Sequence, residues 1–485
     1  MNGDKRQYLP PATTPLRQDL TAIIAAMTAA IDPSSLVRDR LSLGQPAGQL
    51  QCDNQPVSVA GGGPLNLDRL NQIVVVGGGK AAASFAAGLE ALLGPQRLAQ
   101  HQVVGLVSVP EGCGLPLRRI EVRETRPGGV NLPTAAVVAA TGEMLAMLGQ
   151  LGPDDLVIVL ITGGGSALLE APVEGISLEL ITRVTQQLAT GGADITTINT
   201  VRRVASQVKG GGLATACTAG RLLAVVLSDV IGDDLGTIAS GPCLPAAIDV
   251  AGLATLLARF EITATDRERL LRAATHASSQ QWQPPPDHSG CWTTPTGCRV
   301  GHLLLGSNAT AVAAAAAAAE ACGYQVVSAD TVTAAETADD VGGRLARHSR
   351  ELLAASQQDG QPRAVIEGGE ATVAVPSDHG RGGRNQQTVL TAAADVLAAG
   401  EGWPTSLLLA SFGTDGEDGP TSAAGGFIES PVATRISRQP ATLRRAIDRC
   451  DAHPLLAAAG GLIETGPTGT NVADVRLVLM RPGRA

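Results

Sequence analysis

The feature that most constrains the fold is a series of short, continuous apolar runs, each followed at once by a glycine-rich or polar loop. In the first half of the chain the runs cover 73–80, 103–109, 156–166 and 222–234. Runs of Val, Ile and Leu without polar alternation are typical of strands buried on both faces, as in a parallel sheet. Helical patterns follow the loops, so we predict a doubly wound α/β sheet.

A second α/β alternation begins after residue 298, with apolar runs at 302–308, 324–329, 363–375, 406–419 and 475–480. Between the two halves, residues 280–298 carry three consecutive prolines and no periodicity, which is typical of a linker or a long loop. A chain of 485 residues exceeds what one hydrophobic core usually serves. We therefore expect two α/β domains, residues 1–285 and 299–485.

The N-terminal segment is less regular. The first 20 residues are polar and contain prolines, which predicts an extended arm. From Asp19 the spacing of apolar residues predicts an amphipathic helix with Leu20, Ile23, Ile24 and Met27 on one side. The stretch from there to Asp68 is rich in Gly and Gln and is expected to be a loop or an irregular hairpin.

Composition narrows the class of function. The formal net charge of −9 argues against nucleic acid as a partner, because phosphate backbones need clustered Lys and Arg. The chain has neither an N-terminal signal-like apolar run nor about 20 consecutive apolar residues, and its eight cysteines lack metal-site spacing. We expect a cytoplasmic enzyme with a small-molecule substrate and no membrane partner; a homo-oligomer is left open.

Two glycine loops follow predicted strands. Gly77, Gly78, Gly79 and Lys80 lie where a helix begins, and free N–H groups at such a point favour a phosphate or a carboxylate. The pattern Gly77, Gly79, Ala82 also fits a weak dinucleotide fingerprint, but the acid expected at the end of the next strand is poorly matched by Glu111. The second loop, with Gly164, Gly165 and Ser166, lacks P-loop spacing.

Acidic and basic loops add further chemistry. Asp229, Asp233 and Asp234 follow one strand, and carboxylates beside phosphate loops are what magnesium requires. Asp415, in the loop 413–420, could serve as a base or as another magnesium ligand. Arg381 and Arg384 stand among glycines, which suits a forked grip on phosphate or carboxylate.

Taken in order, seven segments closely resemble the glycerate 2-kinase family, whose C-terminal part is the MOFRL domain. They are VVGGGKAA, TGGGSALLEAPVEGISLE, INTVRRVASQVKGGGLA, SDVIGDDLGTIASGP, GGEATVAV with GRGGRNQQ, SFGTDGEDGPTSAAGG and TGPTGTNVADV. The resemblance implies a Rossmann-like N-terminal domain, a MOFRL-type α/β C-terminal domain and an active site in the cleft between them. It also implies phosphorylation of D-glycerate on its 2-hydroxyl by ATP with a divalent metal.

Roles follow from the resemblance and the loops together. Lys80, Arg384 and Asp415 match the catalytic residues of the family. The nucleotide contacts are assigned to Gly77, Gly78, Gly79, Gly164, Gly165, Ser166, Asn308 and Glu370. Magnesium is assigned to Asp229 and Asp233.

The sequence departs from the family at several positions. Relatives read G-H-P-[VL]-P-D where this chain has Val130 and Thr134, N-T-V-R-K-H-L-S where it has Val204 and Ala205, and GRNQE where it has Gln387. The alternatives are therefore a kinase for a related hydroxy acid, or an NAD(P)H-dependent hydroxypyruvate reductase, a name that similar chains have carried. A non-catalytic nucleotide sensor is a third, disfavoured because Lys80, Arg384 and Asp415 are all present.

Overall fold

The chain folds into two compact units in a computed structural model, which describes residues 14–45, 47–128, 130–279, 290–332, 336–400 and 402–482. The contiguous unit is Pro33–Leu305. The split unit combines Met1–Asp32 with Gly306–Ala485. Each unit has its own sheet and its own hydrophobic core.

The contiguous unit contains a seven-stranded sheet in the order β6-β5-β4-β7-β8-β10-β9. The four pairings among the first five strands are all parallel. Their order confirms the predicted doubly wound sheet, with the switch in direction between β4 and β7. The strands are β4 (Ile73–Gly78), β5 (Val104–Pro110), β6 (Ile120–Arg126), β7 (Leu156–Ile161), β8 (Arg221–Leu227), β9 (Trp292–Thr293) and β10 (Arg299–Gly306).

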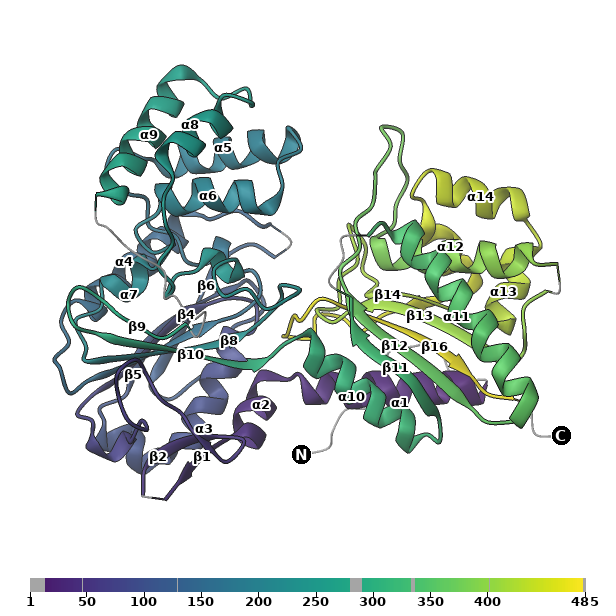
Figure 1. Cartoon of the computed structure of the whole chain (residues 1–485), viewed down its shortest axis with the longest axis horizontal. Helices are drawn as coiled ribbons and strands as arrows, with labels where there is room; N and C mark the ends of the chain where they lie inside the picture. Colours follow the sequence, from purple (N-terminus) through teal and green to yellow (C-terminus); the bar gives the residue numbers. More distant parts are fainter. Residues whose placement is uncertain are drawn as a thin grey trace. The chain divides into compact units, whose positions relative to one another are not determined.

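Helices surround this sheet and also build a separate layer. Those that contact the strands or follow them closely are α3 (Ala82–Gln100), α4 (Ala135–Leu148) and α7 (Gly212–Thr215). The separate helical layer consists of α5 (Leu178–Thr190), α6 (Ile195–Ala205), α8 (Val250–Leu257) and α9 (Ala264–Ser278), teal in Figure 1. This layer has its own apolar cluster around Val184, Val201 and Leu257.

The stretch before the main sheet is more ordered than its composition predicts. Helix α2 (Pro33–Arg40) leads into a small antiparallel sheet of β1 (Leu41–Gly44), β2 (Gln49–Cys52) and β3 (Gln55–Pro56). The predicted irregular hairpin is therefore present, but α2 was not anticipated. Its apolar residues Leu36 and Val37 are buried, and α2 packs on α3.

The split unit has a six-stranded mixed sheet in the order β11-β12-β16-β13-β14-β15. Only β11 and β12 pair in parallel, and the other four pairings are antiparallel. The strands are β11 (Gln325–Thr331), β12 (Arg363–Gly369), β13 (Leu407–Gly413), β14 (Gly425–Glu429), β15 (Leu462–Ile463) and β16 (Asp474–Met480). The final strand, β16, is fully buried between β12 and β13 and runs antiparallel to both. A continuous apolar run predicts a buried strand but not its direction relative to its neighbours.

Helices cover both faces of this second sheet. Figure 1 shows α1 (Pro15–Ala30) and α10 (Asn308–Ala321) on one face, and α11 (Ala338–Asp359) and α12 (Arg384–Ala398) on the other. The remaining helices of the unit are α13 (Ser430–Ser437), α14 (Pro440–Asp448) and α15 (Ala452–Ala459). The parallel-sheet expectation thus holds for the contiguous unit only.

Helix α1 belongs to the split unit although it lies at the other end of the sequence. The predicted apolar side, including Leu20, Ile23 and Met27, is buried. The helix begins at Pro15, earlier than predicted, because the Thr14 hydroxyl accepts a hydrogen bond from the Arg17 N–H and caps it. The Arg17 guanidinium then pairs with the buried Glu429 carboxylate at the end of β14. The rest of the predicted arm, residues 1–13, lies outside the described residues.

The boundary between the units also differs from the expected one. Residues 280–289 of the predicted linker lie outside the described residues. Residues 290–298 belong to the contiguous unit, where β9 pairs with β10 and the Cys298 side chain is buried. The units divide after Leu305, and the N-terminal helix crosses to the second unit.

All eight cysteines lie within the described residues, and none forms a disulfide. No single described helix is both long enough and apolar enough to cross a membrane; α1 and α2 reach that length only when counted together across a 67° bend.

Candidate functional site

The two glycine loops of the contiguous unit meet where β4 and β7 end. The Lys80 N–H donates to the Gly163 carbonyl at 2.9 Å, and the Ala81 N–H donates to the Thr162 hydroxyl at 3.1 Å. Gly79 has φ +144°, and a Cβ there would lie 2.0 Å from the Thr162 Oγ1. Glycine is therefore required by the close approach of the two loops. This is the switch point of the sheet, where doubly wound folds bind ligands.

Two cationic side chains border the second loop. A Cβ built on Gly164 would lie 3.4 Å from Nη2 of Arg126 and 3.8 Å from Cγ of Lys80. Lys80 precedes α3, whose N-cap residue Ala81 provides no side-chain hydrogen bond to the helix. Arg126 ends β6 and is 5% exposed. The loop thus lies between two positive groups, an arrangement that suits an anion.

Ser166 lies in a hydroxyl network that includes residues from three elements. Its Oγ lies 2.9 Å from the Ser240 Oγ, which donates to the Asn199 side-chain oxygen at 2.9 Å. Arg202 of α6 reaches the Ser166 Oγ at 3.4 Å, and burial lowers its pKa. The network holds the Ser166 hydroxyl beside a guanidinium, as a phosphate-binding hydroxyl would require.

The loop that carries Ser240 is conformationally strained. Ala239, Ser240 and Gly241 have φ values of +51°, +63° and +66°, in the left-handed region. Two of these residues are not glycine, and such conformations persist where the surroundings impose them, often at functional sites. The side chain of Ala239 would touch a Cβ on Gly165 at 3.0 Å, so this loop is packed directly against the glycine loop.

Asp229 and Asp233 follow β8 as the sequence predicts. Both are half-buried, and Asp233 has φ +56°. Their neighbour Asp234 shapes the turn, because its carboxylate accepts hydrogen bonds from the Thr237 hydroxyl and the Gly236 N–H. Among the described residues no group of three or more His, Cys, Asp or Glu side chains is arranged to hold a metal ion.

The split unit gathers a second set of charged groups at one edge of its sheet. Arg384 is the first residue of α12 and makes a two-pronged ion pair with Asp474, at 2.6 and 2.9 Å. Its Nη1 also lies 3.1 Å from the Glu370 carboxylate. Burial alone would lower the pKa of Arg384, but the Asp474 carboxylate outweighs it and raises that pKa. The fork expected to grip phosphate is therefore bonded to a carboxylate of this unit.

Asp415 lies beside this ion pair. It follows β13, and a Cβ built on Gly413 would lie 3.2 Å from its Oδ1 and 3.4 Å from the Oδ1 of Asp474. The Glu417 N–H donates to the Asp415 carboxylate at 3.0 Å. Arg384, Glu370, Asp415 and Asp474 therefore form one cluster, which we call the arginine–carboxylate cluster.

The side chain of Asn308 fixes the backbone around Asp474, a member of this cluster. Its side-chain N–H groups donate to the carbonyls of Val472 and Asp474, at 2.8 and 3.0 Å, and its oxygen accepts from the Thr331 hydroxyl. The amide, predicted to contact nucleotide, is thus used within the protein and fixes the start of β16.

Asp418 orients the helix that carries Arg384. Its carboxylate accepts the N–H groups of Asn385 and Gln386, at 3.0 and 2.9 Å, and so satisfies the first turn of α12. Burial raises the pKa of this carboxyl to about 6, while the two N–H donors act in the opposite direction.

Sequence reasoning assigned no role to four residues of these sites. Polar residues were expected after apolar strands, whereas Asp474 begins one and Arg126 ends a charged strand that was not predicted. Asn199 and Arg202 lie within helix α6. The segments TGPTGTNVADV, which contains Asp474, and INTVRRVASQVKGGGLA, which contains Asn199 and Arg202, are part of the family resemblance and could have indicated these three residues.

The chain is similar to known proteins over most of its length. A family described as a domain of unknown function, DUF4147, matches residues 19–273, and the MOFRL family matches residues 363–474. Glycerate kinase from Homo sapiens is 32% identical, over 96% of this chain and 94% of its own. D-glycerate 2-kinase from Thermotoga maritima is 34% identical, over 86% of this chain and 92% of its own.

A solved structure matches as well. The crystal structure of glycerate kinase from Thermotoga maritima superposes with a TM-score of 0.74 and 30% sequence identity. The match covers 96% of this chain and 99% of the other. The similarity therefore extends through both units.

Proposed function

Because this chain belongs to the glycerate kinase family, we propose that it transfers the terminal phosphoryl group of ATP to the 2-hydroxyl of D-glycerate. The observation that carries the proposal is the pair of glycine loops at the switch point of the contiguous sheet, bordered by Lys80 and Arg126. Phosphates bind where cations converge on a loop that carries no blocking side chain.

The phosphate-binding role falls to the contiguous unit. Gly77, Gly78 and Gly79 are buried and let the two loops pack closely, which shapes the cradle. Gly164, Gly165 and Ser166 form the side of the cradle proposed to contact the nucleotide. Lys80 stabilises the charge that develops on the transferred group, which is how such enzymes obtain most of their rate.

The acceptor side of the reaction is assigned to the arginine–carboxylate cluster. Asp415 accepts the proton of the attacking 2-hydroxyl as the hydroxyl oxygen bonds to phosphorus and the bond to ADP breaks. Arg384, with its Nη1 directed at Glu370, positions this region. The proposal thus requires groups from both units, and the placement of the active site in the interdomain cleft stays a prediction.

Magnesium is the metal proposed to accompany ATP. It is held by one or two carboxylates together with phosphate oxygens, so a protein cluster of three ligands is not required. Asp229 and Asp233 fit this requirement, because both follow β8 at the edge where β4 and β7 end. When bound, the metal would neutralise phosphate charge.

The departures from the family pattern bear on substrate identity. Thr134 caps α4, because its hydroxyl accepts the Val137 N–H at 3.2 Å. Val204 is 2% exposed and packs in the apolar cluster of the helical layer. These two side chains have structural roles here, so their presence does not by itself indicate a different hydroxy acid. Of these three departures, Val130, which is 41% exposed, is the one that stays open to a role in selectivity.

The decisive assay measures ADP release with ATP, magnesium and a panel of hydroxy acids, followed by phosphorus NMR of the product. We expect turnover with D-glycerate and formation of 2-phosphoglycerate. Steady NADH consumption with hydroxypyruvate in the absence of ATP would contradict the kinase assignment and support the hydroxypyruvate reductase alternative.

A second test uses the scarcity of lysine in this chain. The only lysines are Lys5, Lys80 and Lys209, and Lys209 is fully buried in an ion pair with Glu170. ATP should protect Lys80 from acetylation by an amine-reactive reagent, as measured by peptide mass spectrometry. Labelling of Lys5 serves as the internal control and should not change. Equal labelling of Lys80 with and without ATP would remove it from the nucleotide site.

A further inference from the structure

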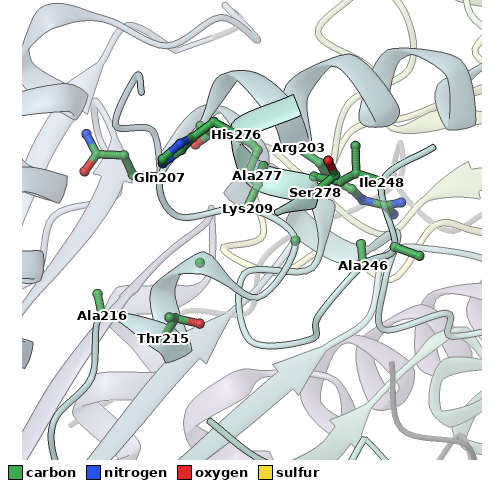
Figure 2. Close-up of a pocket in the computed structure, with 14 residues that line it drawn as sticks. Arg203, Gln207, Lys209, Thr215, Ala216, Ala246, Ile248, His276, Ala277 and Ser278 are labelled. Carbon is green, nitrogen blue, oxygen red and sulfur yellow. The ribbon is translucent and has the colours of Figure 1, made fainter. Parts of the chain in front are cut away.

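The contiguous unit contains a cavity of about 770 Å³ that the glycine loops do not line. We call it the α6–α9 pocket. Arg203 of α6 and His276 and Ala277 of α9 line one side, and Ile248 lies before α8; Thr215 of α7 and Ala216 line the other (Figure 2). Its volume is within the range of sites that take small molecules.

The ionisable side chains that line the pocket are all basic. The described residues that line the pocket include three basic side chains, Arg203, Lys209 and His276, and no carboxylate. The charge of Lys209 is matched, because its Nζ bonds the Glu170 carboxylate at 2.5 Å and the Leu169 carbonyl at 3.0 Å. In a chain of net charge −9, a pocket with the Arg203 guanidinium and no carboxylate among its described lining residues favours an anionic ligand.

Arg203 is the group best placed to meet that ligand. One of its terminal nitrogens donates to the Gly236 carbonyl at 2.6 Å, and its Nε is buried without a hydrogen-bond partner. Burial lowers the pKa of Arg203, and the nearby Asp234 carboxylate partly offsets this. Because the side chain as a whole is only half-buried, an anion in the pocket would pair with this partly desolvated guanidinium through its accessible part.

Part of the remaining wall is apolar, beside the polar side chains of Ser206, Gln207, Thr215 and Ser278. Ala246, Ala247 and Ile248 line it before α8, and Ala277 lines it from α9. An inorganic ion would leave this surface unused. The lining therefore fits a ligand with a charged head and an apolar body.

We propose that the α6–α9 pocket is a second binding site, separate from the glycine loops, for a small organic anion whose acidic head contacts Arg203. The turn that forms its floor is bonded to the strained loop: the N–H groups of Gly210 and Gly211 donate to the carbonyls of Ser240 and Gly241, at 3.1 and 2.8 Å. Ser240 in turn contacts Ser166. Occupancy of the pocket is thereby coupled to the position of the Ser166 hydroxyl.

The binding test uses calorimetry on the full chain with benzoate as the organic anion and benzamide as its uncharged counterpart. We expect saturable binding of benzoate and at least about tenfold weaker binding of benzamide, since the guanidinium recognises the charge. No benzoate binding, or equal binding of both compounds, would overturn the proposal.

Two variants locate the site. Ala277→Glu places a carboxylate in the pocket without touching the contacts of Arg203, and it should weaken benzoate at least about tenfold. Thr275→Glu is the matched control, on the same helix but exposed and outside the lining, and should bind as the wild type does. Unchanged binding in Ala277→Glu, together with loss in Lys80→Ala, would assign benzoate to the glycine loops and reject the pocket.

The coupling has its own readout. Benzoate should shift the KM for ATP in the wild type and in Thr275→Glu, but not in Ala277→Glu, because ligands at coupled sites change each other's affinity reciprocally. A KM that is unchanged at saturating benzoate would overturn the coupling through Ser240 while leaving the binding result to decide the site.

Discussion

The two units bring functional side chains to a sheet edge in different ways. In the contiguous unit the paired strands β4, β7 and β8 are parallel, so the loops that follow them meet at one edge. In the split unit β16 runs antiparallel to β12 and β13, so its first residue lies beside their last residues. Asp474 therefore faces Gly413 and Gly369 in register, although it precedes a strand.

The units also differ in what their loop cation does. Lys80 lies in a loop fixed by backbone hydrogen bonds from its own N–H and that of Ala81. Arg384 instead forms a two-pronged pair with Asp474, a carboxylate whose side chain is fully buried. The same sequence pattern, a cation among glycines, thus belongs to a loop fixed through backbone N–H groups in one unit and to a buried ion pair in the other.

The largest effect is expected for Lys80→Ala. Loss of a cation that stabilises the transferred phosphoryl group should reduce kcat by about a hundredfold, or about 3 kcal/mol. Stability should change by about half a kcal/mol or less, as for most loop substitutions. The matched control is Lys209→Ala, which leaves the buried Glu170 carboxylate without its cation. It should lower the free energy of unfolding by about 3 kcal/mol. Steady-state kinetics and urea unfolding measure both, and near wild-type turnover of Lys80→Ala would exclude it from the site.

Arg384→Ala should lower both activity and stability. Its place in a glycine loop predicts a small stability change, but the structure revises that expectation, because the variant leaves Asp474 buried without its cation. The loss of stability should be about 3 kcal/mol. Arg381→Ala, an exposed arginine of the same loop, is the control and should cost about half a kcal/mol or less. A wild-type unfolding midpoint for Arg384→Ala would contradict the difference between the units.

The fold was predictable where continuous apolar runs form parallel strands. The strands β4, β5, β7 and β8 were located within a few residues, because buried parallel strands are continuous runs of Val, Ile and Leu. Strand β6, IEVRETR, was not predicted because charged residues interrupt its apolar pattern. The antiparallel placement of β16 between β12 and β13 was not predicted either. An apolar run carries no information on the direction of a strand relative to its neighbours.

The candidate sites were predictable in part for the same reason. Lys80 and the glycines of the second loop follow apolar strands, and Gly77 and Gly78 end β4. The structure brings the two loops together. Asp474 and Arg126 could not be placed, because their positions depend on strand order. Helix α1 joins the split unit through Arg17 and Glu429, residues about 400 positions apart, and no local pattern reports such a contact.

A smaller effect should follow from Arg384→Lys. Lysine keeps the positive charge but cannot make two parallel hydrogen bonds to Asp474. We expect turnover between that of the wild type and Arg384→Ala, about tenfold reduced, with about 1 kcal/mol of stability lost. If rate and stability both match the wild type, charge alone suffices and the fork has no role.

The smallest expected effect is a difference in pH response between the units, carried by two histidines. In the contiguous unit burial lowers the pKa of His302 to about 4, partly offset by its contact with the Gly290 carbonyl. In the split unit the hydrogen bond with Glu367 raises the pKa of His348, against its burial. The two shifts have opposite signs, so the units should respond to pH in opposite directions.

For His302 the folded pKa is below the unfolded value of about 6.5, so the unfolded state takes up the proton first and stability falls as pH drops from about 6.5 towards 4. For His348 the folded pKa is above it, so its stabilisation is complete below about pH 6.5 and is lost as pH rises through the folded pKa. At pH 5.5 the loss of stability from His302 should be about 1 kcal/mol, and hydrogen exchange resolves the responses of both histidines by region. After division by the intrinsic exchange rate at each pH, the protection of β10 peptides should fall at pH 5.5 and that of α11 peptides at pH 8, and His302→Gln and His348→Gln should each remove only its own response. A loss of protection in both peptides at the same pH extreme would show that the two histidines do not set this difference.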